Sequence, residues 1–198
     1  MTRKRVAILI SGRGSNMAAL IEAAKAADYP AEIALVVSNV PDAAGLARAR
    51  EASVTTAVLD HKPFGKDRAA FETALQNVLD EHRIELICLA GFMRLFTAEF
   101  VQRWSGRMLN IHPSLLPQFP GLDPHGQALR AGAKTSGATV HFVIPETDAG
   151  PVIAQESVPV LAHDTPDTLA ARVLEAEHRL YPAALKRVAA GEGRYNQP

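Results

Sequence analysis

The stretch Arg107-Met-Leu-Asn-Ile-His-Pro-Ser-Leu-Leu-Pro117 begins as a strand and stops at a proline. Strand side chains alternate between two faces, so Asn110 and His112 point the same way. Pro113 cannot continue a central ladder, which places His112 at or just past the carboxyl end of the strand. An amide donor beside an imidazole suits a reaction that stabilises an oxyanion and moves a proton. The stretch therefore predicts both a strand end and a candidate catalytic pair.

The chain before this stretch alternates short apolar runs with amphipathic segments. Such runs are typical of strands that are buried on both faces of a parallel sheet. Repeated strand–helix order implies right-handed crossovers and a parallel sheet. The predicted strands are 5–10, 33–38, 54–59, 85–90 and 107–111, and the predicted helices run to about 27 and over 42–52, 67–82 and 97–104.

The chain after this stretch has a different character. Four of the thirteen prolines fall within 113–124, which indicates a rigid loop. The order of the later strands suggests an antiparallel addition to the sheet, and 191–198 are predicted to be a frayed tail. The predicted elements are a helix at 124–131, strands at 138–143 and 151–159, and a long helix entered through Asp164-Thr165-Pro166.

Together these elements predict an α/β fold with a single domain over 1–198. Its Rossmann-like, mostly parallel sheet is flanked by helices and extended by an antiparallel addition toward the C-terminus. Residues of about 5–111 would form a phosphate-binding half. Residues 112–190 would carry the catalytic loops, the added strands and the long C-terminal helix. A chain of 198 residues is long enough to bury an ample core.

Charge and cysteine content narrow the classes of function. Acidic and basic residues balance at 21 each, so the chain has no general electrostatic attraction to nucleic acid or an anionic membrane. The single cysteine, Cys88, lies in an apolar run and is predicted to be an inert core residue. One thiol permits no disulfide or metal–thiolate site, and the histidines lack metal-binding spacing. The apolar run 6–10 is too short for a signal peptide and no run approaches a membrane span, so we expect a cytoplasmic protein without a metal.

The glycine-rich segment Ser11-Gly-Arg-Gly-Ser-Asn16 follows the first predicted strand and precedes a helix. This geometry aims backbone N–H groups and the positive end of the helix dipole at an anion. Neither the dinucleotide-binding fingerprint nor the P-loop lysine is present. The segment is therefore either a phosphate site for a small substrate or a tight turn in which a serine or asparagine caps the helix.

Further candidate binding residues lie at or near the same edge of the predicted sheet. Ligands of parallel sheets bind beyond the carboxyl ends of the strands, and the segment 92–96 begins there. Its large apolar side chains are either pocket wall or plain core, and the residues alone favour core. Arg68 is either solvated or binds a carboxylate. Glu177 lies on the apolar stripe of the last helix, where it either pairs with an arginine or histidine of the core or holds substrate hydroxyls.

A lone histidine near a strand end is more often structural than catalytic. For His112, the neighbouring Asn110, the proline stop and an acidic loop at 144–150 favour a catalytic role. A carboxylate beside an imidazole favours the protonated ring and fixes its orientation. Asp148 is the better candidate for that carboxylate, and Glu146 is the weaker one. The Gly-x-Ser-x-Gly motif of serine hydrolases is absent, so that chemistry has little support.

Five blocks of the chain carry a specific resemblance: Val6-Ala-Ile-Leu-Ile-Ser-Gly-Arg-Gly-Ser-Asn16, Leu89-Ala-Gly-Phe-Met-Arg94, Asn110-Ile-His-Pro-Ser-Leu-Leu-Pro117, Asp148-Ala-Gly-Pro-Val152 and Ala176-Glu-His-Arg-Leu-Tyr-Pro182. With these blocks the chain closely resembles the glycinamide ribonucleotide transformylases (phosphoribosylglycinamide formyltransferases), a folate-dependent family of purine synthesis. The resemblance extends over nearly the whole chain. The third block alone marks the wider group of enzymes that use formyltetrahydrofolate.

The resemblance implies direct transfer of a formyl group from the co-substrate 10-formyltetrahydrofolate to the amine of 5-phosphoribosylglycinamide in de novo purine (IMP) synthesis. It implies a catalytic role for Asn110, His112 and Asp148. The first two would stabilise the tetrahedral oxyanion, His112 would relay protons, and Asp148, through water, would keep the ring protonated. The expected partners are these small molecules, with no nucleic acid, no membrane, and a monomer or weak homodimer.

The same resemblance implies two sets of binding residues. Those for the ribonucleotide are Arg13, Gly14, Ser15, Asn16 and Glu177. Those that line the folate pocket are Arg68, Met93, Arg94, Leu95, Phe96, Asn110, His141, Ile144 and Asp148.

The chain departs from the commonest family pattern at three places. Arg13 could add a phosphate contact, Asp123-Pro124 replaces a frequent histidine-containing pair, and Ala149 could stiffen the loop that carries Asp148. Three other functions remain as alternatives. A formyltetrahydrofolate hydrolase would share the catalytic residues but usually has an extra N-terminal domain, and a methionyl-tRNA formyltransferase needs a further C-terminal domain and a basic face. A non-enzymatic phosphoribosyl-binding module would need only the glycine-rich turn and Glu177.

Overall fold

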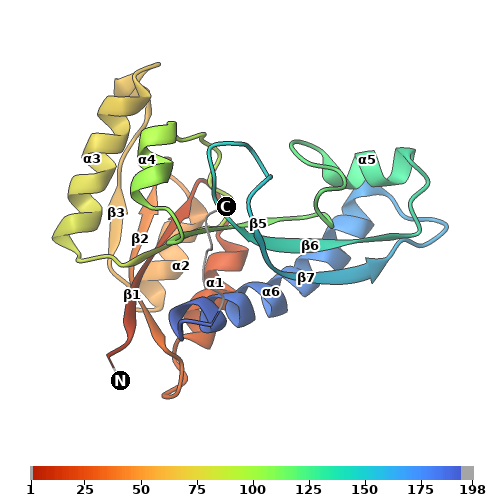
Figure 1. Ribbon diagram of the computed structural model, residues 1–198, viewed down its shortest axis with the longest axis horizontal. Helices are drawn as coiled ribbons and strands as arrows, with labels where there is room; N and C mark the ends of the chain where they lie inside the picture. The colour runs from red at the N-terminus through yellow and green to blue at the C-terminus, as the bar shows by residue number, and fades with distance from the viewer. Residues whose placement is uncertain (1, 193–198) are drawn as a thin grey trace.

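The structure, a computed structural model, describes residues 2–192, and the part of the predicted tail from 193 to 198 lies outside them. Seven strands form one sheet in the order β3-β2-β1-β4-β5-β6-β7 (Figure 1). The strands are β1 (Lys4–Ile10), β2 (Ala31–Ser38), β3 (Thr56–Val58), β4 (Leu86–Leu89), β5 (Met108–His112), β6 (Thr135–Phe142) and β7 (Val152–Pro159). The helices are α1 (Ser15–Ala23), α2 (Ala44–Glu51), the 3-10 turn η1 (Lys62–Phe64), α3 (Arg68–Glu81), α4 (Ala98–Arg103), α5 (Pro124–Arg130) and α6 (Pro166–Ala189).

Parallel and antiparallel pairing divide the sheet. The strands β1 to β5 pair in parallel, whereas β6 runs antiparallel to β5 and β7 antiparallel to β6. Because β2 lies on one side of β1 and β4 on the other, the strand order reverses between β1 and β4. Open α/β sheets bind ligands at such a switch point. The predicted fold class, a mostly parallel sheet with an antiparallel C-terminal addition, is confirmed.

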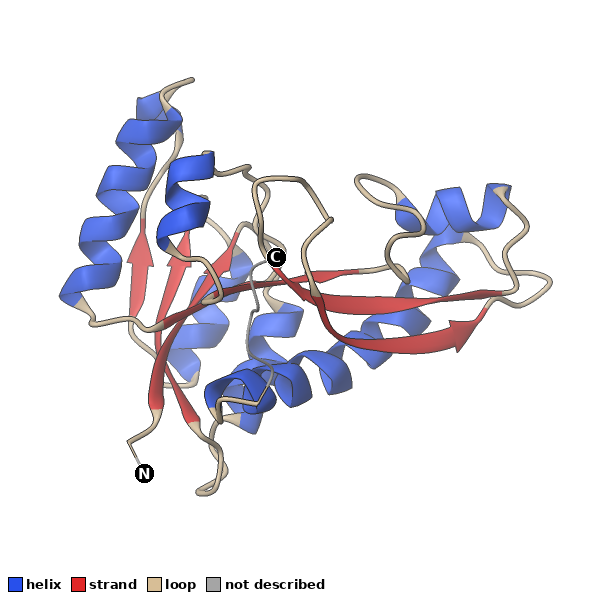
Figure 2. Cartoon of the chain, viewed as in Figure 1, coloured by secondary structure: helices blue, strands red, loops and turns tan. Residues whose placement is uncertain are grey.

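Helices cover both faces of the parallel strands (Figure 2). The strand side chains alternate between the faces, so an apolar cluster fills the space on each side. Ile8 faces a core cluster that α1 and α6 share, and Leu9 faces a second cluster that α3 and α4 close. Cys88 is fully buried in the first cluster, and burial raises the pKa of its thiol to about 12. Its predicted position in the core is therefore confirmed.

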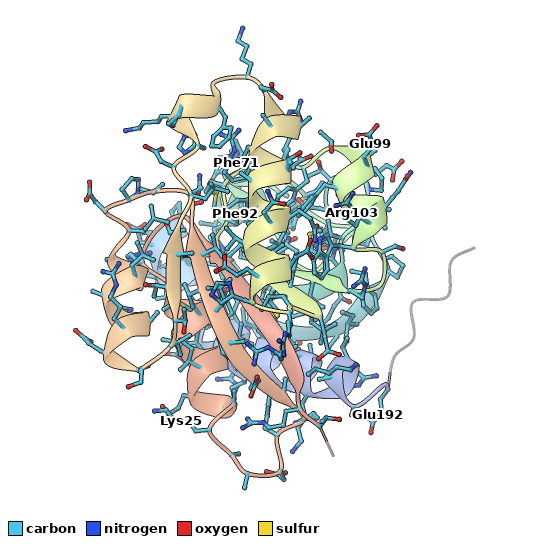
Figure 3. All side chains as sticks on the ribbon, turned by 90° about the vertical axis from the view of Figure 1, so that its left-hand side faces the viewer. Lys25, Phe71, Phe92, Glu99, Arg103 and Glu192 are labelled. Carbon is cyan, nitrogen blue, oxygen red and sulfur yellow. The ribbon has the colours of Figure 1, made fainter. Side chains whose placement is uncertain are left out.

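The helices α3 and α4 cover one face of the sheet. Figure 3 views the molecule from this side, with Glu99 and Arg103 on the outer surface of α4. Phe71 of α3 and Phe100 of α4 are buried beneath. Phe96, in the segment after β4, stacks on Phe100 with ring centroids 4.8 Å apart. The core on this face therefore continues directly into the segment that follows β4.

Several element boundaries differ from the predicted ones for identifiable reasons. β6 begins at Thr135 rather than at 138, because Gly137 belongs to the strand and lies so close to β7 that a Cβ would approach Glu156 O to 2.1 Å. α1 ends at Ala23 rather than near 27, because the chain turns there so that the Tyr29 hydroxyl can donate to Pro182 O at 2.7 Å. β3 is shorter than predicted, and η1 lies between the predicted strand 54–59 and the predicted helix 67–82.

Candidate active site

The glycine-rich turn between β1 and α1 presents free backbone donors. Gly14 precedes the helix in the left-handed region at φ 69°, and no described side chain caps α1. The expected alternative of a serine or asparagine cap is therefore wrong. A Cβ at Gly14 would lie 3.0 Å from Gly45 Cα, so glycine suits both the backbone conformation and the contact with α2. The N–H groups of the first turn of α1 remain available to an anion.

Glu177 lies next to this turn. It is 6% exposed and accepts a hydrogen bond of 2.8 Å from Asn16 Nδ2. No arginine or histidine among residues 2–192 pairs with it, so the structural alternative is wrong. Burial raises the pKa of Glu177, and the Asn16 hydrogen bond opposes that shift. Asn16 Oδ1 is buried without a partner among the described residues. The pair therefore presents acceptor atoms, which suit hydroxyl groups rather than a phosphate.

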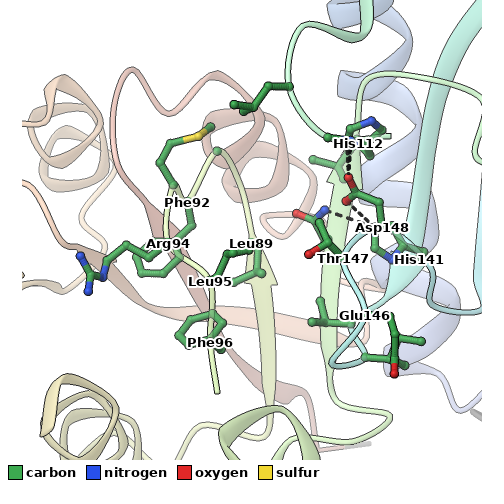
Figure 4. A pocket seen from close by; sticks show the side chains of 18 of the residues that line it. Leu89, Phe92, Arg94, Leu95, Phe96, His112, His141, Glu146, Thr147 and Asp148 are labelled. Carbon is green, nitrogen blue, oxygen red and sulfur yellow. Dashed lines mark hydrogen bonds and ion pairs between the residues drawn. The ribbon is translucent and has the colours of Figure 1, made fainter. Parts of the chain in front are cut away.

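A cavity of about 510 Å³ lies beyond the carboxyl ends of β4 and β5 (Figure 4). It includes every residue that the family resemblance placed in the folate pocket, among them Arg68, His141 and Ile144. Figure 4 shows two opposed walls, with Phe92, Arg94, Leu95 and Phe96 on one side and His112, His141 and Asp148 on the other. A mostly apolar cavity with a few convergent polar groups is typical of a small-molecule site.

The segment after β4 forms one wall of the cavity. Met93 is 73% exposed and Leu95 65% exposed, so the sequence-based preference for plain core at these positions is wrong. The apolar side chains project beyond the end of the strand, where the protein leaves them uncovered. The guanidinium of Arg94 lies 5.0 Å from the centroid of the Phe71 ring, and Arg68 begins α3 at the rim. The outer end of the cavity is thus apolar with two cationic side chains.

Asn110 and His141 face each other across the β5–β6 pair. Phe142 O can only accept, so His141 Nδ1, at 2.9 Å, donates to it. Burial lowers the pKa of His141 despite the opposing effects of this bond and of Asp148, so the ring is neutral near pH 7. Its Nε2 therefore accepts from Asn110 Nδ2 at 3.2 Å. This contact orients the Asn110 amide and leaves a second N–H of the same nitrogen free.

His112 is held from both ends of its ring. Nε2 donates to Phe119 O at 3.0 Å, and Nδ1 lies 3.4 Å from Asp148 Oδ2. Both side chains are more than nine-tenths buried, at 8% and 9% exposed. Both ring nitrogens therefore face acceptor oxygens, a carbonyl at Nε2 and a carboxylate at Nδ1. The expected water between Asp148 and His112 stays a prediction, and the two groups lie 3.4 Å apart here.

Asp148 reaches this position from the loop between β6 and β7. It adopts a left-handed backbone conformation at φ 54°, which is uncommon for a residue other than glycine. Its Oδ2 accepts from Gly121 N at 2.9 Å, and its Oδ1 lies 3.8 Å from His141 Nε2. The carboxylate therefore joins the loop that follows β5 to the two histidines. Glu146, the weaker candidate, is exposed and makes no such contact in Figure 4.

The loop after β5 positions the Phe119 carbonyl, a role that the sequence did not indicate. Thr139 Oγ1 donates to Ser114 O at 2.7 Å and accepts from Leu116 N at 3.0 Å. Gln155 Nε2 donates to Leu116 O and to the same threonine hydroxyl, both at 2.8 Å. These bonds attach the proline-rich loop to β6 and β7. Only the density of prolines gave a signal that this loop is rigid.

The departure at Asp123-Pro124 has a local explanation. Asp123 Oδ1 caps α5 by accepting from Gly126 N at 3.1 Å, and Asp123 Oδ2 pairs with Arg130 at 3.0 Å. Pro124 occupies the first turn, where its missing N–H costs nothing. A Cβ at Gly126 would approach Asp123 Oδ2 to 2.3 Å, so the aspartate and the glycine depend on each other. Both Asp123 and Pro124 also line the cavity.

Residues 2–192 contain neither a membrane-crossing helix nor a cluster of metal-ligating side chains. No helix there combines the length and apolar character that crossing a bilayer requires. No group of three or more histidine, cysteine, aspartate or glutamate side chains there is arranged to hold a metal ion.

A sequence model of the family described as Formyl transferase matches residues 4–185. The chain belongs to the formyl transferase family. Among members of this family, the phosphoribosylglycinamide formyltransferase of Escherichia coli K12 is 45% identical over 186 residues, which are 94% of this chain and 87% of that protein. The solved structure of phosphoribosylglycinamide formyltransferase from Brucella melitensis is 52% identical, with a TM-score of 0.91 and 100% of both chains covered.

A longer relative shares the same formyl transferase region. The trifunctional purine biosynthetic protein adenosine-3 of Gallus gallus is 53% identical over 187 residues, which are 94% of this chain but 18% of that protein. The chain therefore spans about a fifth of such trifunctional relatives, at 19% of the human protein.

Proposed function

We propose that this chain transfers the formyl group of 10-formyltetrahydrofolate to the amine of 5-phosphoribosylglycinamide, a step of de novo purine (IMP) synthesis. The observation that carries the proposal is the convergence of Asn110, His112 and Asp148 on the wall of one cavity. The similarity to phosphoribosylglycinamide formyltransferases over most of the chain supports the same substrates.

The ribonucleotide would bind at the turn between β1 and α1. The backbone N–H groups of Gly14, Ser15 and Asn16 would hold the phosphate at the positive end of α1, and the exposed Arg13 would add a charge. Glu177 and the free Asn16 Oδ1 would accept from the ribose hydroxyls. The side chain of Asn16 would thus accept from the ribose, while its backbone N–H would donate to the phosphate.

The folate would occupy the cavity between the two walls. Met93, Leu95 and Phe96 would cover the flat faces of the ring system from one side, and Ile144 and His141 would line the other. Arg68 and Arg94 at the rim would attract the carboxylates of its glutamate tail. The volume of about 510 Å³ falls in the range of drug-sized ligand pockets.

In the reaction, Asn110 and His112 would stabilise the oxygen of the formyl group. The second N–H of the Asn110 amide and the positive charge of a protonated His112 ring would stabilise the negative charge that develops as the amine attacks. As the bond between the formyl carbon and N10 breaks, His112 would pass a proton to N10 of the leaving folate, and the neutral ring would then accept the proton that the attacking amine loses. Asp148 would hold the imidazole in its protonated form and orientation.

The remaining features of the proposal follow from the same chemistry. Small molecules are the partners, nucleic acid and membranes are not required, and no step needs a metal. We place the enzyme in the cytoplasm as a monomer or weak homodimer. Its one cysteine is buried, which suits a reducing compartment.

A formyl-transfer assay with and without 5-phosphoribosylglycinamide tests this function. Tetrahydrofolate should form only when the ribonucleotide amine is present, and the formylated ribonucleotide should form in equal amount. Equal rates of tetrahydrofolate release without the ribonucleotide would instead identify a formyltetrahydrofolate hydrolase. Binding of the ribonucleotide without turnover would leave a phosphoribosyl-binding module.

A further inference from the structure

Ser11 joins the turn that follows β1 to the cavity wall that follows β4. Its backbone N–H donates to Gly91 O at 3.1 Å. Its hydroxyl oxygen accepts from Met93 N at 2.8 Å. One residue thus makes two hydrogen bonds to the segment 91–96 and is itself the first residue of the glycine-rich turn. These contacts lie at the switch point between β1 and β4.

The direction of the Ser11 hydroxyl is fixed by its second partner. Because Ser11 Oγ accepts from Met93, its single proton is donated to Asn39 Oδ1, 2.6 Å away. Asn39 follows β2, is 3% exposed, and accepts at its backbone oxygen from His61 Nδ1 at 2.8 Å. The Ser11 hydroxyl therefore donates its hydrogen bond to a buried amide and not to solvent.

The other side of the turn is held by α2. Gly45 N donates to Gly12 O at 3.0 Å, and Gly45 has no room for a side chain because a Cβ would approach Ile10 Cδ1 to 2.6 Å. The turn is thus fixed against α2 on one flank and against the cavity wall on the other. Ser11 is the side chain that makes the second attachment.

We propose that Ser11 is a positioning residue that sets the separation of the two substrates, with Asn39 orienting its hydroxyl. The inference rests on the proposed function, since the turn would hold the ribonucleotide and the segment 91–96 the folate. Ser11 touches no reacting atom. It fixes the distance between the segments that hold the attacking amine and the formyl carbon. A misplacement of about 1 Å can cost about 10²-fold in rate.

A purely structural role for Ser11 makes a different prediction. Loss of the hydroxyl would then lower the thermal stability of the fold, and each folded molecule would keep its full rate. If Ser11 sets the separation, each substrate still binds its own segment, so the KM values change little while kcat falls.

The test compares Ser11→Ala with Ser11→Thr, which keeps the hydroxyl, and with Ser157→Ala on the exposed edge strand β7 as a matched control. Rates are expressed per folded molecule, with the folded fraction taken from circular dichroism. We expect Ser11→Ala to lose about tenfold in kcat with less than about threefold change in either KM, Ser11→Thr to recover most of the rate, and Ser157→Ala to match wild type. Asn39→Ala should show a smaller loss of kcat in the same direction.

Wild-type kcat per folded molecule in Ser11→Ala would overturn the inference, and so would a loss confined to KM. Either result leaves the proposed function intact, provided that wild type formylates the ribonucleotide. If wild type itself transfers no formyl group to the amine, the proposed function fails before Ser11 is tested.

Discussion

Asn110 and His112 lie on a strand, whereas Asp148, which contacts His112, lies on a loop. The register of β5 against β6 pairs Asn110 with His141 and His112 with Thr139, so the sheet itself fixes these positions. Asp148 instead depends on a left-handed backbone conformation and on one hydrogen bond from Gly121. The difference shows that the sheet positions Asn110 and His112, whereas two loops that meet position the Asp148 carboxylate.

Replacement of the loop carboxylate should break this arrangement most severely. Asp148→Asn keeps the shape but removes the charge that holds the His112 proton, so we expect turnover to fall by about 10³-fold or more. Ribonucleotide affinity should change little, since Asp148 lies away from the glycine-rich turn. Single-turnover rates and ribonucleotide titration measure the two effects.

A matched change in the same loop provides the control for Asp148→Asn. Glu146→Gln removes an exposed carboxylate near the cavity and should keep nearly wild-type turnover. Wild-type turnover in Asp148→Asn would remove this residue from the mechanism.

Replacement of the strand-borne histidine should have the next largest effect. His112→Ala removes the proposed proton carrier, so we expect a loss of at least about a hundredfold in kcat. Water can fill the space that the ring leaves, which limits the loss. The comparison is with His163→Ala, which changes an exposed histidine after β7 and should be silent. A loss below about tenfold in His112→Ala would contradict a proton-relay role.

Replacement of the amide's partner sharpens the comparison within the strand pair. His141→Phe removes the acceptor for Asn110 Nδ2, so the amide is free to rotate and kcat should fall by about tenfold.

The same variant tests the pH dependence of stability. Because folding lowers the pKa of His141, the folded protein binds fewer protons at this site than the unfolded chain does. Stability is therefore lost as pH falls below 6.5 toward the lowered value. In His141→Phe the fall in melting temperature on acidification should be smaller than in wild type, because the contribution of His141 is gone. An unchanged pH dependence would show that His141 titrates normally.

The smallest effect on turnover should come from the ribose side. Glu177→Gln keeps the hydrogen bond to Asn16 in reach but weakens acceptance from hydroxyls, so KM for the ribonucleotide should rise several-fold while kcat stays near wild type. The folded-state pKa of Glu177 is raised above its ordinary value of 4.5, so its favourable contribution is present below that value and is lost as pH rises. Glu177→Gln should therefore melt at a higher temperature than wild type at neutral pH, and a lower melting temperature there would contradict the assignment.

The sequence predicted those features that depend on local pattern. Apolar runs and the proline after His112 located the strands and placed the candidate catalytic pair at a strand end. The alternation of strands and helices predicted parallel pairing, and the order of the later strands predicted the antiparallel addition. The start of β6 was predicted too late because Gly137 was assigned to the preceding loop. In the structure, glycine is required there by close packing on β7 and not by a turn.

Features that depend on distant contacts were beyond the reach of the sequence pattern. Met93 and Leu95 look like core residues, and only the absence of covering protein beyond β4 makes them a cavity wall. The partner of Glu177 is Asn16, 161 positions away, and no periodicity indicates such a pairing. The contact between Asn110 and His141 likewise required the register of β5 against β6.

The position of α6 has a consequence for synthesis of the chain on the ribosome. Met17 and Leu20 of α1 lie fully buried in the core cluster that α6 completes, and Glu177 of α6 supplies the partner of Asn16. During synthesis, residues near the start of the chain therefore lack their packing partners until the helix that begins at Pro166 has been made. A ribosome-stalled chain that ends before this helix should expose the apolar face of α1 to chaperones, and ribonucleotide binding should begin only once α6 has emerged.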